Sequence, residues 1–183
     1  MKKTLRLSAG LFSFSLFISN AFAFGLPQTV ASVDLARFAG TWYEVARNPI
    51  VFEPTCACAR QVLTPRADGK VDVYNSCNEG SPSGNLREIR GTAEATDSSG
   101  AKLSVDFGFF WSGDYWIVGL APDYSYAVVT DRIGYSLYIL SRTPEMDPAL
   151  YDQALKDAAA QVSISRLVVQ PKQVCSYPTA MWR

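Results

Sequence analysis

The feature that most constrains the fold is a series of eight short apolar-rich runs separated by turn residues. Asp68-Gly69, between the second and third runs, is a strong hairpin signal because glycine tolerates positive φ. Runs of this length with short connections predict eight consecutive antiparallel strands. The expected strands are Thr41–Arg47, Cys58–Pro65, Lys70–Cys77, Leu86–Ala95, Ala101–Phe109, Tyr115–Leu120, Tyr124–Thr130 and Ser136–Ser141.

The period of the apolar residues changes after the eighth run. Asp147-Pro148 has the pattern of a helix N-cap followed by the first helical residue, and apolar residues then recur at helical spacing from Leu150 to Val162. A short strand, Leu167–Val169, is expected next. Eight antiparallel strands form a sandwich or a barrel, and successive hairpins favour the barrel. We therefore expect an all-β fold, an eight-stranded antiparallel up-and-down barrel with one C-terminal α-helix packed outside.

The first 23 residues have the pattern of an export signal. Three cations precede the apolar run Leu7–Ile18, and Ala21-Phe22-Ala23 supplies small residues before a cleavage site. The run is too short for a comfortable membrane span. We expect a cleaved signal peptide at 1–23 and a single domain at 24–183, soluble and either periplasmic or secreted. Because the first cysteine is Cys56, no lipid anchor is expected at the cleavage site.

The charge and the missing histidine argue against several classes of function. The chain has 17 Lys+Arg, 17 Asp+Glu and no histidine. A formal charge of zero argues against a basic nucleic-acid footprint. Without histidine there is no Ser-His-Asp or Cys-His nucleophile pair, no His-ligated zinc and no imidazole general base. We expect a protein that is not an enzyme and has no nucleic-acid partner.

The four cysteines are most simply explained as two disulfides. An even number of cysteines in an oxidising compartment favours this interpretation. Two alternatives are a redox motif at Cys56-Ala57-Cys58, or a soft-metal site that would need Cys77 and Cys175 as further ligands. We expect structural disulfides, with no metal and no cofactor.

Aromatic residues crowd the second half of the expected barrel. Strand alternation allows only about half of them to face inward. Phe109-Phe110-Trp111 falls in an expected loop, where three adjacent aromatics are not expected to be wholly exposed. These three would rim the mouth of a cavity or pack against a neighbouring loop. The expected ligand-binding residues are Phe107, Phe109, Trp111, Tyr115, Ile117, Tyr126 and Tyr138.

Three motifs in order make the sequence similar to the lipocalin family, in its bacterial lipocalin and apolipoprotein D branch. The first is an extended Gly-x-Trp motif, Gly40–Arg47, with Phe52-Glu53 at the expected distance beyond it. The second comprises Asp114–Val118 and Pro122–Ala127, and has Pro122-Asp123-Tyr124 where the family usually has Thr-Asp-Tyr. The third is Tyr138–Pro144. The resemblance covers essentially Phe38 to Val169.

The resemblance implies structural roles for the motif residues. The indole of Trp42 would plug the closed end of the barrel, and Arg142 would lay its guanidinium over that indole. Such a cation–π contact contributes about 0.5–2 kcal/mol. Together with Gly40, Asp123 and Tyr124, these residues would close the barrel rather than contact a ligand.

The same resemblance suggests a disulfide pairing. Cys58 corresponds to a cysteine that pairs with the C-terminal tail, which implies Cys58–Cys175 and leaves Cys56–Cys77. The hairpin register alone allows Cys58–Cys77 almost equally well.

The resemblance also implies a cavity for a small hydrophobic molecule. Tyrosine hydroxyls, or Arg87 or Arg90 near the mouth, would orient a charged head group, although a solvated strand face is the commoner place for such arginines. We expect binding, storage or transport of a fatty acid or lysophospholipid in the cell envelope, by a monomer or weak dimer without a stable membrane anchor. Two alternatives stay open: a lipocalin-fold enzyme of the isomerase or synthase type, for which Glu44 is the suggestive carboxylate, and a protein-interaction module that uses Phe109–Trp111.

Overall fold

A computed structural model describes residues 25–50, 55–109, 111–170, 175 and 177 of the chain. The expected signal peptide at 1–23, the motif residues Phe52-Glu53 and the aromatic residue Phe110 lie outside the described residues. No helix in the described part of the chain is long and apolar enough to cross a membrane.

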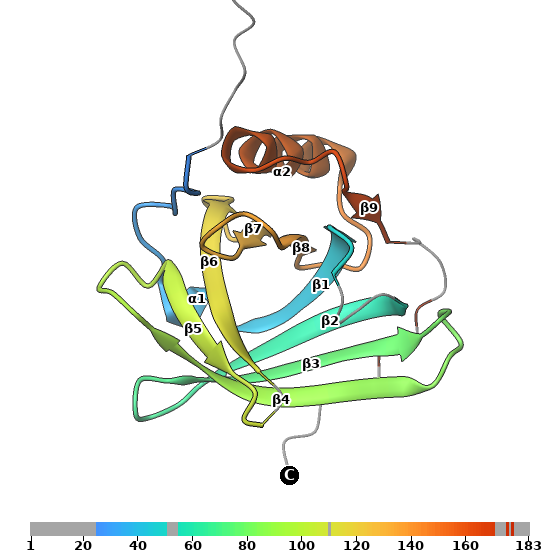
Figure 1. Ribbon diagram of the computed structural model, residues 1–183, viewed down its shortest axis with the longest axis horizontal. Helices are drawn as coiled ribbons and strands as arrows, with labels where there is room; N and C mark the ends of the chain where they lie inside the picture. The colour runs from blue at the N-terminus through green and yellow to red at the C-terminus, as the bar shows by residue number, and fades with distance from the viewer. Residues whose placement is uncertain (1–24, 51–54, 110, 171–174, 176, 178–183) are drawn as a thin grey trace, which may run out of the picture.

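The strands form a closed antiparallel barrel, which confirms the expected fold (Figure 1). Each strand pairs with the next, and the first strand pairs with both the second and the eighth, so the sheet closes on itself. The barrel strands are β1 (Gly40–Arg47), β2 (Cys56–Pro65), β3 (Val71–Glu79), β4 (Leu86–Ala95), β5 (Lys102–Asp106), β6 (Ser112–Leu120), β7 (Tyr126–Thr130) and β8 (Leu137–Ser141). The remaining elements are α1 (Leu35–Phe38), α2 (Pro148–Gln161) and β9 (Val168–Val169), which pairs with β1.

The strand limits differ from expectation where the backbone turns. β5 ends at Asp106 rather than Phe109, because Gly108 has a φ of +68° and its N–H donates to the Asp106 carboxylate at 2.8 Å. β7 begins at Tyr126 rather than Tyr124, since Tyr124 has a φ of +64° in the left-handed region. The four-residue helix α1 was not expected from the sequence.

Helix α2 begins at the expected N-cap and packs outside the barrel. The Asp147 carboxylate accepts hydrogen bonds from the N–H groups of Ala149 and Leu150 at 2.8 and 3.3 Å. Figure 1 shows the helix lying across β6, β7 and β8. A side chain at Gly119 on β6 would meet the Asp157 Cβ at 2.9 Å, so glycine lets the helix approach the sheet closely.

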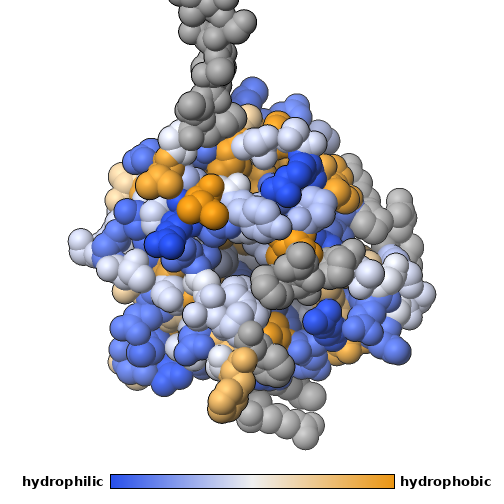
Figure 2. All heavy atoms as spheres, viewed as in Figure 1, coloured by the Kyte–Doolittle hydropathy of each residue, from blue (hydrophilic) through white to orange (hydrophobic). Residues whose placement is uncertain are grey.

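The described residues form two hydrophobic cores, one inside the barrel and one beneath α2. On β7, Ala127 and Val129 belong to the interior core, whereas Tyr126 and Val128 belong to the core beneath the helix. Every residue of β7 is therefore buried, as expected for a strand covered on both faces. Seen from the side of Figure 1, hydrophilic residues cover most of the surface, with apolar residues in small groups between them (Figure 2).

Two disulfides fix the barrel wall and the C-terminal segment. Cys56 is bonded to Cys77, 21 residues away, and Cys58 is bonded to Cys175, 117 residues away. These are the pairings that the family resemblance implies. Because every cysteine of the chain has a cysteine partner, there is neither a redox pair at Cys56-Ala57-Cys58 nor a thiolate metal site.

Candidate functional site

One end of the barrel is closed by Trp42 and Arg142. The indole is fully buried, and its Nε1–H donates to the carbonyl of Phe38 at 2.8 Å. The Arg142 guanidinium lies 3.6 Å from the centroid of the Trp42 ring, as the resemblance implies. It also donates five hydrogen bonds of 2.8–3.2 Å to backbone carbonyls, those of Arg37, Phe38, Ala39, Thr41 and Tyr124. These contacts tie α1, the start of β1 and the turn before β7 together across this end of the barrel.

The other motif residues also lie at the closed end of the barrel and hold its turns in place. Gly40 has a φ of +96°, and a Cβ there would lie 3.4 Å from an Arg142 nitrogen. The Asp123 carboxylate accepts the N–H of Ser125 at 3.0 Å, which holds the turn before β7. The Tyr124 hydroxyl accepts the N–H of Asp34 at 3.0 Å, which ties that turn to the start of α1.

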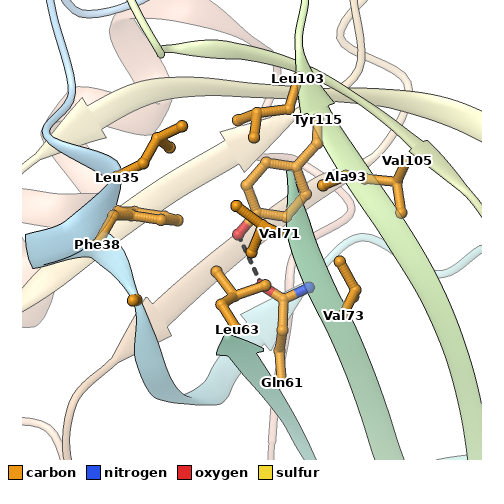
Figure 3. Close-up of a pocket in the computed structure, with 11 residues that line it drawn as sticks. Leu35, Phe38, Gln61, Leu63, Val71, Val73, Ala93, Leu103, Val105 and Tyr115 are labelled. Carbon is orange, nitrogen blue, oxygen red and sulfur yellow. Dashed lines mark hydrogen bonds between the residues drawn. The ribbon is translucent and has the colours of Figure 1, made fainter. Parts of the chain in front are cut away.

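A small apolar pocket lies inside the barrel, above the closed end. Its volume is about 10 Å³, which is about the space of one water molecule. Figure 3 shows the side chains from α1 and from several strands converging on it. The lining residues are Leu35, Phe38, Ala39, Gln61, Leu63, Val71, Val73, Ala93, Leu103, Val105 and Tyr115.

A row of polar side chains crosses the barrel interior at this pocket. The Tyr115 hydroxyl donates to Gln61 Oε1 at 2.8 Å, drawn as a dashed line in Figure 3, and Gln61 Nε2 donates to Asn75 Oδ1 at 3.2 Å. A tyrosine hydroxyl is already protonated at neutral pH, and burial raises the pKa of Tyr115 further above its usual value. Gln61 and Asn75 are register partners on β2 and β3, and neither was expected as a site residue. A glutamine at an inward position of a strand is the one sequence signal that would have pointed to this row.

Four of the expected ligand-binding residues belong to the interior core. Phe107 and Ile117 are buried there, and Tyr115 and Tyr138 pack against the same core while keeping some accessible surface. The structure therefore brings Phe107, Tyr115, Ile117 and Tyr138 into one apolar environment.

Phe109 and Trp111 lie at the turn between β5 and β6. Trp111 packs on Phe107, with ring centroids 4.8 Å apart, and keeps 37% of its surface exposed. Phe109 is fully exposed and does not line the interior pocket. The expectation that the aromatics of this loop are not wholly exposed therefore fails for Phe109 and holds for Trp111, whereas the expected role of both residues in ligand binding stays a prediction.

Tyr126 lies outside the barrel and is not part of the interior site. It packs in the core beneath α2, and its hydroxyl donates to Asp157 Oδ2 at 2.7 Å. Assigning it to the cavity was wrong, because β7 alternates between the interior and the helix-covered face and Tyr126 falls on the latter.

Two of the charged residues that were expected to act in ligand binding or catalysis, Arg90 and Glu44, have other partners. Arg87 is exposed, and Arg90 is a half-exposed residue that lies 4.6 Å over the Tyr74 ring and 3.5 Å from a Glu88 carboxylate oxygen. Glu44 is buried at a β-bulge, where it accepts from Arg47 Nη1 at 2.5 Å and from Gln170 Nε2 at 3.0 Å. The suggestive carboxylate is therefore held in an ion pair.

Among the described residues, no group of three or more His, Cys, Asp or Glu side chains is placed to hold a metal ion. The interior pocket is instead a small apolar space with one row of hydrogen-bonding groups. Such a lining suits an apolar molecule rather than an ion.

Comparisons with known proteins agree with this geometry. The model of the Lipocalin-like domain matches residues 33–172. Temperature-induced lipocalin-1 of Arabidopsis thaliana is 33% identical over 79% of this chain and 82% of its own. The outer membrane lipoprotein Blc of Citrobacter freundii is 32% identical over 72% and 75%, and apolipoprotein D of Rattus norvegicus is 32% identical over 67% of each chain.

Solved structures share the fold at lower sequence identity. Insecticyanin from the tobacco hornworm Manduca sexta superposes with a TM-score of 0.64, 20% identity and coverage of 79% of this chain and 84% of its own. The siderocalin Ex-FABP, whose structure is described as functioning through dual ligand specificities, gives a TM-score of 0.58 at 19% identity, covering 75% and 96%. With its closed barrel, its Trp42–Arg142 closure and these matches, the chain belongs to the lipocalin family.

Proposed function

We propose that this protein binds a small hydrophobic ligand inside the barrel and stores or carries it, and that the ligand is a fatty acid or a lysophospholipid. The observation that carries the proposal is the apolar pocket inside a barrel whose one end is closed. Family membership supports it, since one fold relative is described as having dual ligand specificities. The proposed ligand contacts are Phe107, Ile117, Tyr138 and Trp111, which packs on Phe107, while Tyr115 lines the pocket that the ligand would have to enlarge.

An acyl chain is an energetically reasonable ligand for such an interior. Each CH₂ group that moves from water into an apolar site contributes about 0.8 kcal/mol. About ten buried methylenes would therefore supply the roughly 8 kcal/mol of a micromolar complex. The affinity should then rise about fourfold for each methylene that reaches the interior.

The ring of Tyr115 would have to move for a chain to reach the bottom of the barrel. The pocket beneath it holds about one water, and the hydroxyl is hydrogen-bonded to Gln61 across the interior. We propose that the ligand displaces the Tyr115 ring. Gln61 and Asn75 would then contact the acyl chain or the polar group of the ligand. Tyr115→Ala, which removes the ring, should therefore bind long acyl chains more tightly than the wild type.

A titration of intrinsic tryptophan fluorescence tests the proposal. The delipidated protein is titrated with fatty acids and lysophospholipids of increasing chain length, together with two variants of β4. Ala93→Leu fills the pocket and should weaken binding at least about fivefold, whereas Thr92→Leu adds bulk at the neighbouring position, which alternates to the outside. A flat response of the folded protein to the whole panel, or equal binding by both variants, would contradict the proposal.

The proposal contains no catalytic step. The alternative of a thiol enzyme lacks a nucleophile, since all four cysteines are in disulfides. We further propose that the protein is periplasmic or secreted, and that it is a monomer or weak dimer without a nucleic-acid partner or a stable membrane anchor. The exposed Phe109 keeps a protein-interaction surface as the second candidate function. A function that survives Ala93→Leu in the pocket but is lost with Phe109→Ser would favour it.

A further inference from the structure

The barrel interior contains hydrogen-bonding groups that a plain acyl chain does not use. Gln61, Asn75 and Tyr115, called here the polar row, are joined by two hydrogen bonds of 2.8 and 3.2 Å. Figure 3 shows the Tyr115 hydroxyl meeting the Gln61 side chain among apolar side chains. Apart from Gln61 and Tyr115, the described residues that line the pocket are apolar, and none of them is charged. The polar row is therefore what a ligand in this pocket meets besides hydrocarbon.

The polar row lies next to the closed end of the barrel. Gln61 is the register partner of Trp42, whose indole closes that end. The Tyr115 ring lies edge-on to Phe38 with ring centroids 6.4 Å apart, and Phe38 packs on Trp42 with centroids 5.0 Å apart. A molecule that enters from the opposite end therefore reaches the row with its leading end.

The polar row is accessible and has unused hydrogen-bonding capacity. Gln61, Asn75 and Tyr115 each keep part of their surface accessible. Asn75 lies two residues from Val73, which lines the pocket, so both side chains point to the interior face of β3. The Asn75 oxygen accepts from Gln61, but no residue in the described part of the chain accepts a hydrogen bond from the Asn75 amide nitrogen. The row thus offers free N–H donors to a ligand.

A plain acyl chain leaves the polar row incompletely bonded. To occupy the pocket, the chain displaces the Tyr115 ring and breaks its hydrogen bond to Gln61. A methyl or methylene group cannot replace that bond, so the Gln61 oxygen is left in an apolar space without a donor. A buried polar group that loses its partner in this way weakens a complex about tenfold or more.

A hydroxyl group on the ligand would replace the hydrogen bond that Tyr115 gives up. A hydroxyl has one donor and two acceptor lone pairs. It can donate to Gln61 Oε1 and accept from the Asn75 amide nitrogen, because these residues are register partners on β2 and β3. A carboxylate fits less well at this depth, since it has no proton to donate to the Gln61 oxygen and no lysine or arginine among the described lining residues to neutralise it.

We propose that the polar row selects ligands whose leading end carries a hydroxyl group, such as an acyl chain hydroxylated at or near its terminal carbon. The charged head of the ligand stays towards the open end, and Gln61 and Asn75 bind the terminal hydroxyl beside the closed end. This inference rests on the proposed binding of an acyl ligand inside the barrel, and it names the class of ligand that the interior favours.

The ratio of two dissociation constants tests the proposal. The delipidated protein is titrated with hexadecanoic acid and with ω-hydroxyhexadecanoic acid, which differ only in the terminal hydroxyl, and intrinsic tryptophan fluorescence is recorded. An apolar pocket without hydrogen-bonding groups would bind the hydroxylated acid about tenfold more weakly, because the hydroxyl loses its hydrogen bonds to water. The wild type should bind the hydroxylated acid at least as tightly as hexadecanoic acid.

Substitutions in the polar row should reverse this preference. Gln61→Met keeps a side chain of similar length without hydrogen-bonding groups, so hexadecanoic acid should then bind about tenfold more tightly than the hydroxylated acid. Asn75→Leu removes the donor and should shift the ratio about threefold or more in the same direction. Gln153→Met makes the first substitution at an exposed position of α2, outside the barrel, and should leave the ratio within about twofold of the wild type.

The outcomes separate this proposal from the proposed function. A wild type that prefers hexadecanoic acid, or an equal ratio in the wild type, Gln61→Met and Asn75→Leu, would overturn the selection of a hydroxyl group while acyl binding itself stands. The absence of saturable binding of both acids would overturn the proposed function and this inference together.

Discussion

Replacing Arg142 by methionine tests how the closed end of the barrel is held together. The guanidinium donates five hydrogen bonds to backbone carbonyls and lies 3.6 Å over the Trp42 ring. Hydrogen bonds to charged groups contribute about 1.5–3 kcal/mol each and the cation–π contact about 0.5–2 kcal/mol. Because Arg142 is only half-buried, the carbonyls regain water and these contributions do not add. We expect a loss of about 3–4 kcal/mol in the free energy of unfolding, from a typical total of about 5–15 kcal/mol.

The matched control for this variant is Arg90→Met. Arg90 also lies over an aromatic ring, that of Tyr74 at 4.6 Å, but its side chain is 49% exposed. Its loss should cost less than about 1 kcal/mol. Urea titrations followed by tryptophan fluorescence compare the two variants. The comparison holds when the free energy of unfolding of both variants has the same slope against the urea concentration. If Arg142→Met came within about 1 kcal/mol of Arg90→Met, the hydrogen-bonded closure would not be what stabilises this end.

Three other predictions concern the disulfides, the helix and pH. Replacing both cysteines of Cys58–Cys175 by alanine should lower the free energy of unfolding by about 5 kcal/mol, and the same change at Cys56–Cys77 by about 3 kcal/mol, because the two disulfides close loops of 117 and 21 residues. A larger loss for Cys56–Cys77 in urea titrations would contradict this prediction. Tyr126→Phe should lose about 1 kcal/mol of stability with the bond to Asp157 and leave ligand affinity unchanged, as calorimetry can measure. Burial alone would raise the pKa of Asp131, but hydrogen bonds from Ser136, Ile133 and Tyr135 outweigh burial and lower that pKa. The ionised carboxylate therefore stabilises the fold above its unfolded pKa of about 3.9, and this stabilisation is lost as the pH falls through the folded pKa. The difference in the free energy of unfolding between the wild type and Asp131→Asn should be large at pH 7 and small at pH 3.

The barrel could be predicted because its signals are local. Turn residues such as Asp68-Gly69 separate the strands, and the N-cap at Asp147 marks the helix. The closed end followed from the family resemblance through Trp42 and Arg142. The short helix α1 carries too few residues for a periodic pattern to appear.

Which aromatic residues face the interior could not be read from the sequence. In β7 both faces are buried, so hydrophobic alternation does not distinguish the interior from the side beneath α2, and Tyr126 was misassigned. The full exposure of Phe109 could not be foreseen either, because it lies in a turn that depends on the positive φ of Gly108. The surroundings of Glu44 could not be predicted either, because Gln170, which donates to it, lies 126 residues away in the sequence.

The measurement that tests the central claim most directly is where a bound acyl chain lies. Protein labelled with ¹³C in its leucine and valine methyl groups is saturated with a fatty acid, and intermolecular nuclear Overhauser effects are recorded. Binding inside the barrel predicts contacts from the chain to Val73, Leu103 and Val105, which line the interior pocket. Contacts confined to α2 or to the outer face of the barrel, or no saturable complex at all, would contradict the account.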